Sequence, residues 1–215
     1  MDLNNRNHYI VQCMRPVCQF RFPVGPTDPE QPHCPKCGAP TQMVDLPYAA
    51  LRVPPENKTN TRTVSVLVDN LRSAFNVGSI FRTADGAGVS HVYLCGITPT
   101  PDHPKVGKTA LGAESTVPWT QVWNAAALVK DLKQQGTTVW ALEGGAAAHS
   151  IYHSLDQFME QNILLVVGNE ISGVDPGILE LCDQSVFLPM LGQKESLNVA
   201  VAFGIAIYTI QFSRM

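Results

Sequence analysis

From residue 62 onward, short apolar runs alternate with longer segments whose apolar residues recur at helical spacing. This alternation is typical of an α/β domain built around a mostly parallel sheet. The apolar runs predict strands at residues 63–69, 91–96, 137–142, 163–168 and 184–189. Helices are expected at about 77–87, 123–135, 155–161, 175–182 and 198–212. We therefore expect residues 62–215 to form one α/β domain.

The last of these helices, Asn198 to Phe212, is apolar on nearly every side. A helix with apolar residues all round is normally buried. A monomer explains such a pattern poorly in a terminal helix, so we expect part of it to face another subunit.

Composition and charge exclude several classes of protein. No apolar run approaches the roughly 20 residues needed to span a bilayer, and the first nine residues are polar, so we expect a cytoplasmic protein without a membrane segment. The formal net charge of −3 argues against a general basic field that coats nucleic acid. Residues 1–58 carry six basic and five acidic side chains, and residues 59–215 carry nine and thirteen. Any contact with nucleic acid must therefore be local.

Four of the six cysteines lie in the first 37 residues, in a segment without helical periodicity. A tetrahedral Zn²⁺ site with four thiolate ligands would supply the compactness that such a short segment cannot obtain from a core. Gly38 suits a tight turn around the sulfur atoms. We predict a structural metal site, with iron as the alternative to Zn²⁺, whose ligands are Cys13, Cys18, Cys34 and Cys37. The module would span residues 1–40, followed by a proline-rich linker at 41–61.

Two other interpretations of these cysteines stay open. A secreted domain would use them in two disulfides, although nothing else in the chain resembles a secreted protein. A redox Cys-x-x-Cys normally opens a helix after a strand, and Gly38-Ala39-Pro40 is a poor helix start.

Three loops follow predicted strands, where open α/β sheets bind their ligands. The first contains Asn76, Gly78 and Arg82, and its alternative interpretation is a helix-capping Asn with an Arg in solvent. The second is Gly168 to Gly173, where Glu170 could hold a ribose hydroxyl, orient a cation, or simply lie in a solvent-exposed turn. In the third, residues 188–192 could grip a flat ring, and Ser196 or Asn198 could simply cap the last helix. The residues alone leave the ligand open.

The three loops resemble, nearly residue for residue, the motifs of the SpoU (TrmH-like) family of RNA ribose methyltransferases in the SPOUT superfamily. The first is similar to Asn76-x-Gly78-x-x-x-Arg82-Thr83-Ala84, with Gly88 following. The second is similar to Gly168-Asn169-Glu170-x-x-Gly173, and the third to Pro189-Met190-x-Gly192-x-x-x-Ser196-Leu197-Asn198-Val199-x-Val201-Ala202. The resemblance covers about residues 62–212, and all three motifs in order are highly specific.

This resemblance implies a parallel sheet with a trefoil knot in its C-terminal third, flanked by helices, and an obligate homodimer. It also implies transfer of a methyl group from S-adenosylmethionine to a ribose 2′-hydroxyl of tRNA or rRNA. Cofactor binding would fall to Leu142, Glu143, Gly144, Gly168, Leu188, Met190, Ser196 and Leu197. The reaction would fall to Asn76, Arg82, Glu170, Ser196 and Asn198.

The role of Arg82 has two versions. The family often assigns the matching residue as the proton acceptor, but a guanidinium is very rarely neutral in a protein. The other version makes Arg82 a fixed cation that binds phosphate and stabilises the developing alkoxide. The cysteine module departs from the basic helical extensions of many family members, and we expect it to help bind RNA through Arg15, Arg21 and Lys36.

Two rival functions remain on the same fold. One is an RNA- or ribosome-binding protein that has lost catalysis, which the intact set of reaction residues argues against. The other is a methyltransferase that acts on a base or on a protein.

Overall fold

The computed structural model describes residues 9–25, 28, 32–45, 63–154 and 161–212. The chain divides into two compact units, Met1–Lys58 and Thr59–Met215. Each unit has a sheet of its own, and each is described by itself below.

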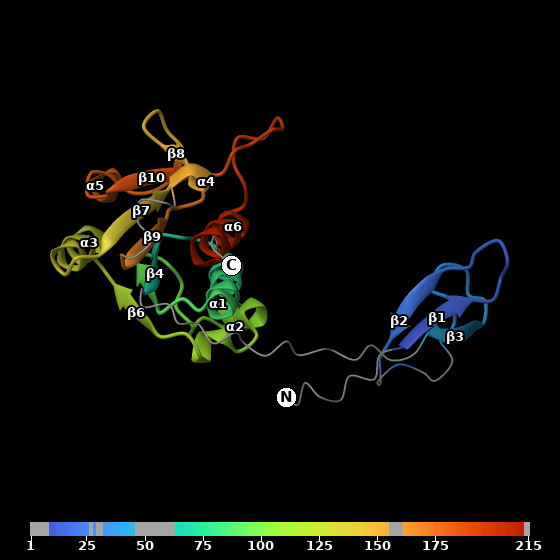
Figure 1. Ribbon diagram of the computed structural model, residues 1–215. Coiled ribbons are helices and arrows are strands. Elements are labelled where there is room, and N and C mark those ends of the chain that lie inside the picture. Colours follow the sequence, from blue (N-terminus) through green and yellow to red (C-terminus); the bar gives the residue numbers. More distant parts are fainter. Residues whose placement is uncertain (1–8, 26–27, 29–31, 46–62, 155–160, 213–215) are drawn as a thin grey trace. The chain divides into compact units, whose positions relative to one another are not determined.

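The N-terminal unit contains three antiparallel strands in the order β2-β1-β3 (Figure 1). The strands are β1 (Tyr9–Cys13), β2 (Arg21–Val24) and β3 (Thr41–Asp45). Because β3 pairs with β1, the folded module continues past residue 40 to Asp45, into the segment expected to be linker. The rest of that expected linker, residues 46–61, lies outside the described residues.

The larger unit is built on a parallel seven-stranded sheet in the order β6-β5-β4-β9-β7-β10-β8 (Figure 1). This confirms the expected α/β class. The strands are β4 (Val64–Asp69), β5 (His91–Cys95), β6 (Trp119–Val122), β7 (Thr138–Leu142), β8 (His149–Ser150), β9 (Ile163–Val167) and β10 (Gln184–Phe187).

Helices cover both faces of this sheet (Figure 1). Helices α1 (Ala74–Ala87), α2 (Pro104–Ala110) and α6 (Val199–Phe212) pack on one face, and α3 (Ala125–Gln134) and α5 (Pro176–Leu179) pack on the other. A short helix α4 (Ile151–Ser154) and a 3-10 turn, Ala113–Ser115, complete the unit. None of the described helices is long and apolar enough to cross a membrane.

The central strands β4 and β9 are buried on both faces of the sheet, which explains why their sequences are mostly apolar. In β4, Val66 and Val68 join the core under α1 and α6, whereas Leu67 joins the core under α3 and α5. The strand β9 divides its side chains between the two faces in the same way. A parallel strand buried on both faces needs apolar residues at every position.

Several predicted boundaries shift for local reasons. Helix α1 begins three residues before the expected start because the side chain of Ser73 caps it. Helix α5 ends at Leu179 rather than near residue 182, and β10 ends at Phe187. The helix predicted at 155–161 falls almost wholly outside the described residues, and Gln161 lies in a bend.

Candidate functional site

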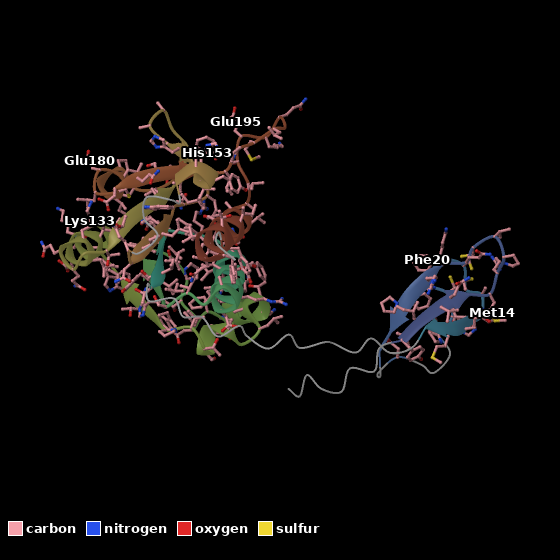
Figure 2. All side chains as sticks on the ribbon, in the orientation of Figure 1. Met14, Phe20, Lys133, His153, Glu180 and Glu195 are labelled. Atoms are coloured by element: carbon pink, nitrogen blue, oxygen red, sulfur yellow. The ribbon has the colours of Figure 1, made fainter. Side chains whose placement is uncertain are left out.

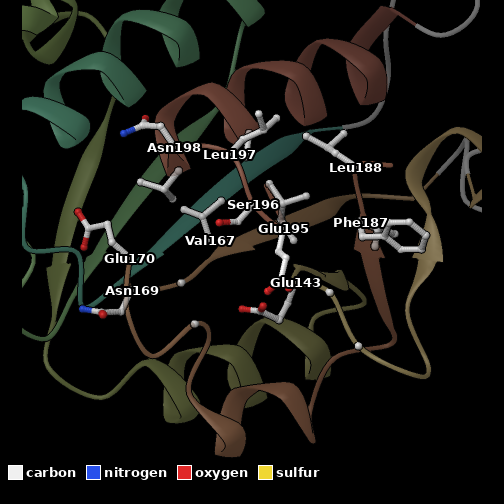
Figure 3. A pocket seen from close by; sticks show the side chains of 18 of the residues that line it. Glu143, Val167, Asn169, Glu170, Phe187, Leu188, Glu195, Ser196, Leu197 and Asn198 are labelled. Atoms are coloured by element: carbon white, nitrogen blue, oxygen red, sulfur yellow. The ribbon is translucent and has the colours of Figure 1, made fainter. Parts of the chain in front are cut away.

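A cavity of about 830 Å³ opens at the carboxyl ends of β7, β9 and β10 and beside the start of α6 (Figure 3). This volume lies within the usual range for small-molecule sites. All of the residues predicted to bind cofactor line it: Leu142, Glu143, Gly144, Gly168, Leu188, Met190, Ser196 and Leu197. The cavity is also lined by Glu170 and Asn198 from the predicted reaction set.

The loop after β9 closes on itself at Gly168. A Cβ at this position would lie 2.3 Å from the backbone of Gly173 and Val174, so only glycine fits without a shift of the backbone. Asn169 fixes the loop from inside, because its Oδ1 accepts hydrogen bonds from the backbone N–H groups of Ile171 and Ser172. The loop is therefore a rigid wall of the cavity.

The carboxylate of Glu143, at the end of β7, also holds this loop. Its Oε2 accepts a hydrogen bond of 3.0 Å from the backbone N–H of Val174. Glu143 therefore connects the loops that follow the neighbouring strands β7 and β9, and this contact occupies one of its two oxygens.

Glu170 is exposed, and its carboxylate is bonded to the N-terminus of α1 (Figure 3). Its two oxygens accept hydrogen bonds from the backbone N–H groups of Arg72, at 3.1 Å, and Ser73, at 3.2 Å. A third bond, of 3.1 Å, comes from Nδ2 of Asn76. Partial burial alone would raise the pKa of Glu170, but these donated hydrogen bonds outweigh it and lower the pKa. The carboxylate therefore joins the second loop to the first.

Asn76 continues this connection to the third loop. Its Oδ1 accepts a hydrogen bond of 3.2 Å from Nδ2 of Asn198. The helix cap is Ser73, so Asn76 lies in the first turn and its amide takes part in a hydrogen-bonded chain that runs from Glu170 through Asn76 to Asn198. Asn198 also caps α6, because its Oδ1 accepts hydrogen bonds from the backbone N–H groups of Ala200 and Val201.

Arg82 lies apart from these groups. It is exposed on α1, six residues beyond Asn76, which corresponds to about 9 Å along a helix axis. Arg82 is not among the residues that line the cavity beside the start of α6. A separate hollow between α1 and α6 is lined by Asn76, Ser79, Thr83, Asn198, Ala200, Val201, Gly204, Ile205 and Tyr208. The structure thus brings four of the five predicted reaction residues together, and leaves Arg82 on the outer face of α1.

Sequence reasoning missed the buried support behind the site. Asp69, at the end of β4, is only 2% exposed and accepts hydrogen bonds from the backbone N–H of Asp175 and from Nδ2 of Asn70. Its burial raises its pKa. Asn70 in turn is bonded through its carbonyl to Nδ2 of Asn169. The signal that could have found this network is a carboxylate that ends an otherwise apolar strand.

In the N-terminal unit, the sulfur atoms of Cys13, Cys18, Cys34 and Cys37 all lie within 4.8 Å of one another. The Cys13 and Cys37 sulfurs are 3.5 Å apart and those of Cys18 and Cys34 are 3.9 Å apart, far beyond the about 2.05 Å of a disulfide bond. A tetrahedron with metal–sulfur bonds of about 2.3 Å has edges of about 3.8 Å. The four thiols are free, and their spacing fits a bound tetrahedral metal ion.

The turn that carries Cys34 and Cys37 has the expected geometry. The backbone N–H groups of Cys37 and Gly38 both donate to the carbonyl of Cys34. Gly38 has φ 68°, which glycine adopts without strain.

Met14 and Phe20 lie at the surface of this unit (Figure 2).

Comparison with known proteins supports the resemblance found in the motifs. The sequence profile of the SpoU rRNA Methylase family matches residues 63–208. The chain is 36% identical over 159 residues to the 23S rRNA (guanosine(2553)-2'-O)-methyltransferase RlmP of Bacillus subtilis, covering 73% of this chain and 61% of that protein. It is 34% identical over 174 residues to the 23S rRNA (guanosine-2'-O-)-methyltransferase RlmB of Xanthomonas axonopodis, covering 78% of this chain and 68% of that one.

Solved structures give the same result. The A. aeolicus TrmH/SpoU tRNA modifying enzyme is 28% identical, with a TM-score of 0.65 over 72% of this chain and 77% of that chain. The AdoMet bound rRNA methyltransferase from Sinorhizobium meliloti is 25% identical, with a TM-score of 0.65 over 71% and 57%. The matches thus cover most of the larger unit of this chain.

Proposed function

The chain belongs to the SpoU rRNA methylase family, and from this premise we propose that it transfers a methyl group from S-adenosylmethionine to a ribose 2′-hydroxyl of tRNA or rRNA. The observation that carries the proposal is the hydrogen-bonded chain Glu170–Asn76–Asn198, which joins three loops at the edge of a cavity of cofactor size. The similar B. subtilis and Xanthomonas proteins are named as guanosine 2'-O-methyltransferases of 23S rRNA. The similar S. meliloti structure is named as AdoMet bound.

The cavity residues fit S-adenosylmethionine by their chemistry. Apolar walls from Leu142, Leu188 and Leu197 suit a flat adenine ring, and the loop backbone at Gly144 and Gly168 supplies polar groups close to it. The bound cofactor supplies an electrophilic methyl group with a good leaving group. The protein must therefore orient the ribose oxygen toward that methyl and help to remove its proton.

Orientation falls to the amides at the edge of the cavity. Asn76 cannot turn freely, because its amide nitrogen donates to Glu170 and its amide oxygen accepts from Asn198. A fixed amide next to the cavity would present the same polar groups to each incoming ribose. Ser196 also lines the cavity and adds a hydroxyl there.

Arg82 would act on the RNA side of the site in one of two ways. It serves either as the proton acceptor or as a cation that binds phosphate and stabilises the developing alkoxide. A guanidinium keeps its proton in most protein environments, which favours the cation. Its position outside the cofactor cavity suits contact with RNA rather than with S-adenosylmethionine.

The assembly in which this chemistry takes place is proposed to be a homodimer, in the cytoplasm, with a trefoil knot in the C-terminal third. Helix α6 supports the dimer, because Val201, Ile205 and Tyr208 form an exposed apolar stripe along it. The motifs support the knot, and the sheet order is compatible with it, because β9 lies between β4 and β7 although it follows β7 in the chain.

The N-terminal module is proposed to bind Zn²⁺ through Cys13, Cys18, Cys34 and Cys37 and to help bind RNA. Arg15 and Lys36 lie next to the cysteine-bearing turns, and Arg21 opens β2. Deletion of residues 1–58 should weaken RNA binding and leave cofactor affinity intact. Unchanged RNA binding would show that the module has a structural role or binds protein.

The first test is transfer of a labelled methyl group from S-adenosylmethionine to separated tRNA and rRNA fractions, followed by nuclease digestion to locate the label. Label on a ribose 2′-oxygen, lost in Arg82→Ala while cofactor binding stays nearly intact, would support the proposal. Label on a base or on protein would contradict it. Cofactor binding without transfer to any RNA would favour a binding protein on the same fold.

A further inference from the structure

Phe75 is an exposed aromatic residue directly beside the candidate site. Its side chain is 46% exposed, and it precedes Asn76 by one position, so the two Cα atoms are about 3.8 Å apart. On α1 it shares the outward face with Ser79 and Arg82, at positions i, i+4 and i+7. A large apolar ring on this face adds nothing to the core.

Phe75 is held in place by the packing of α1 against α2. Its carbonyl accepts hydrogen bonds from Oγ of Ser79, at 2.9 Å, and from Oγ1 of Thr109 on α2, at 3.0 Å. The two helices approach so closely at Gly78 that a Cβ there would lie 2.2 Å from atoms of Val106 and Thr109. The backbone that carries the ring is therefore fixed before any ligand arrives.

Lysines of α2 lie on one side of Phe75, and the carboxylate of Glu170 is bonded to the neighbouring residues Ser73 and Asn76. Nζ of Lys105 lies 6.0 Å from the centroid of the Phe75 ring, and Lys108 is exposed one turn farther along α2. Residues 72–108 carry four basic and two acidic side chains, whereas the rest of residues 59–215 carries five and eleven. An exposed ring among cations is a typical combination for binding single-stranded nucleic acid, in which bases stack and phosphates pair with Lys and Arg.

We propose that Phe75 is a stacking platform for a base of the RNA strand whose ribose is methylated, with Lys105 and Lys108 contacting the phosphates beside it. This inference rests on the proposed function, because it takes Asn76 as the position of the target ribose. A ribose held at Asn76 brings its own base or the next one within reach of the ring. The ring then contributes to affinity for RNA and to the choice of base, but not to binding of S-adenosylmethionine.

The test is equilibrium binding of fluorescent RNA dodecamers of adenylate and of uridylate to the full-length chain, measured by anisotropy. Both probes carry the same charge, but adenine stacks more strongly. The wild type should bind the adenylate probe more tightly, and Phe75→Leu should weaken that binding by roughly tenfold. Phe75→Tyr should retain it, because the aromatic face is kept. Lys105→Ala should reduce the slope of log affinity against log salt by roughly 0.7.

The matched control is Tyr152→Leu, which removes an exposed aromatic ring on α4. It should leave RNA binding unchanged, and none of these variants should change affinity for S-adenosylmethionine. Equal binding of the two probes by the wild type, or unchanged binding in Phe75→Leu, would overturn the inference. So would a smaller sedimenting species for Phe75→Leu, since the ring would then pack against a second copy of the chain.

These outcomes separate the inference from the proposed function. Probe binding is measured without methyl transfer, so it reports on the platform even if no RNA accepts a methyl group. If the wild type methylates RNA and Phe75→Leu binds and methylates it equally well, only the platform fails.

Discussion

The carboxylate of Glu170 accepts a hydrogen bond of 3.1 Å from Nδ2 of Asn76, although the two residues are 94 positions apart in the chain. The same carboxylate accepts from the backbone N–H groups of Arg72 and Ser73 at the start of α1. A negative charge at a helix N-terminus is favourable, because it pairs with the free N–H groups and the positive end of the helix dipole. We therefore expect Glu170 to act mainly by holding Asn76 and α1 in place.

The first prediction concerns the substitution Glu170→Gln. The two carboxylate oxygens of Glu170 accept from three N–H donors. In the glutamine variant only one oxygen remains as an acceptor, and the amide NH₂ group that replaces the other would face N–H groups that it cannot bond. Asn76 would lose its fixed orientation, so methyl transfer should fall by on the order of 100-fold. Steady-state kinetics and cofactor titration will check this, with affinity for S-adenosylmethionine expected to change little. Glu180→Gln, on the exposed end of α5, is the control; equal activity in the two variants would contradict the role given to Glu170.

The second prediction concerns the acid side of the stability profile. The pKa of Glu170 is lower in the folded chain than its ordinary value of 4.5, so its contribution to stability is present above that value. The contribution is lost as the pH falls through the folded pKa. Denaturant unfolding between pH 7 and pH 3 should therefore show a shallower acid loss in Glu170→Gln than in the wild type. Asp69, whose raised pKa affects stability in the opposite direction, is present in both chains. Its effect cancels when the two profiles are subtracted, so the difference reports on Glu170. Parallel profiles would contradict the pKa shift.

Much of the larger unit could be predicted from local sequence. The run that became β9 is apolar at every position and the run that became β4 is interrupted only by Ser65 before Asp69, which indicates burial on both faces of a parallel sheet. Helix α2 and strand β6 were not predicted, because Pro104 and Gly107 are poor helix formers and β6 has four residues with a polar centre. Helix α2 is stabilised by its contact with Gly78, and β6 is stabilised by its pairing with β5. Neither contact produces a recognisable pattern in the local sequence.

The arrangement of the site was predictable only in part. The three loops and the cavity residues follow from motifs that place them at strand ends. The partners of Glu170 do not, because they depend on pairing such as Val64 with Ile163, which sets β9 beside β4 across about a hundred residues. Spacing alone also could not place Arg82, which lies on the outer face of α1 and does not line the cavity, because both a side chain at the site and one in solvent were compatible with the motif.

The third prediction is one tightly bound metal ion per chain, lost in Cys37→Ser. The four sulfurs already lie at distances that suit a tetrahedral ion. A small unit whose described residues form a sheet of three short strands is expected to depend on the metal for folding. Mass spectrometry of the native chain will count the ion, and limited proteolysis should cleave the N-terminal unit of the variant selectively. Cofactor affinity should not change, because the cavity belongs to the other unit.

The matched control for the metal site is Cys182→Ser. This thiol lies in the larger unit and donates to the carbonyl of Ile178 at 3.3 Å. The variant should keep its metal. A native chain that is protease-resistant and free of metal would show that the cysteine cluster is held by its own packing.

The last prediction separates the two roles of Asn198. Its Oδ1 caps α6 and its Nδ2 donates to Asn76. The substitution Asn198→Asp keeps a capping oxygen but loses the donor, whereas Asn198→Ala loses both. The alanine variant should therefore lose about 1 kcal/mol of stability in thermal unfolding through the lost cap, a loss that the aspartate variant does not share.

Methyl transfer should fall in both Asn198 variants, and no less in the aspartate variant than in the alanine variant. In Asn198→Asp, a carboxylate oxygen would face Oδ1 of Asn76. Rotation of the Asn76 amide cannot relieve this contact, because it would turn Oδ1 toward the carboxylate of Glu170. If Asn198→Asp is as active as the wild type, Asn198 is only a helix cap, and the orientation of Asn76 is then set by Glu170 alone.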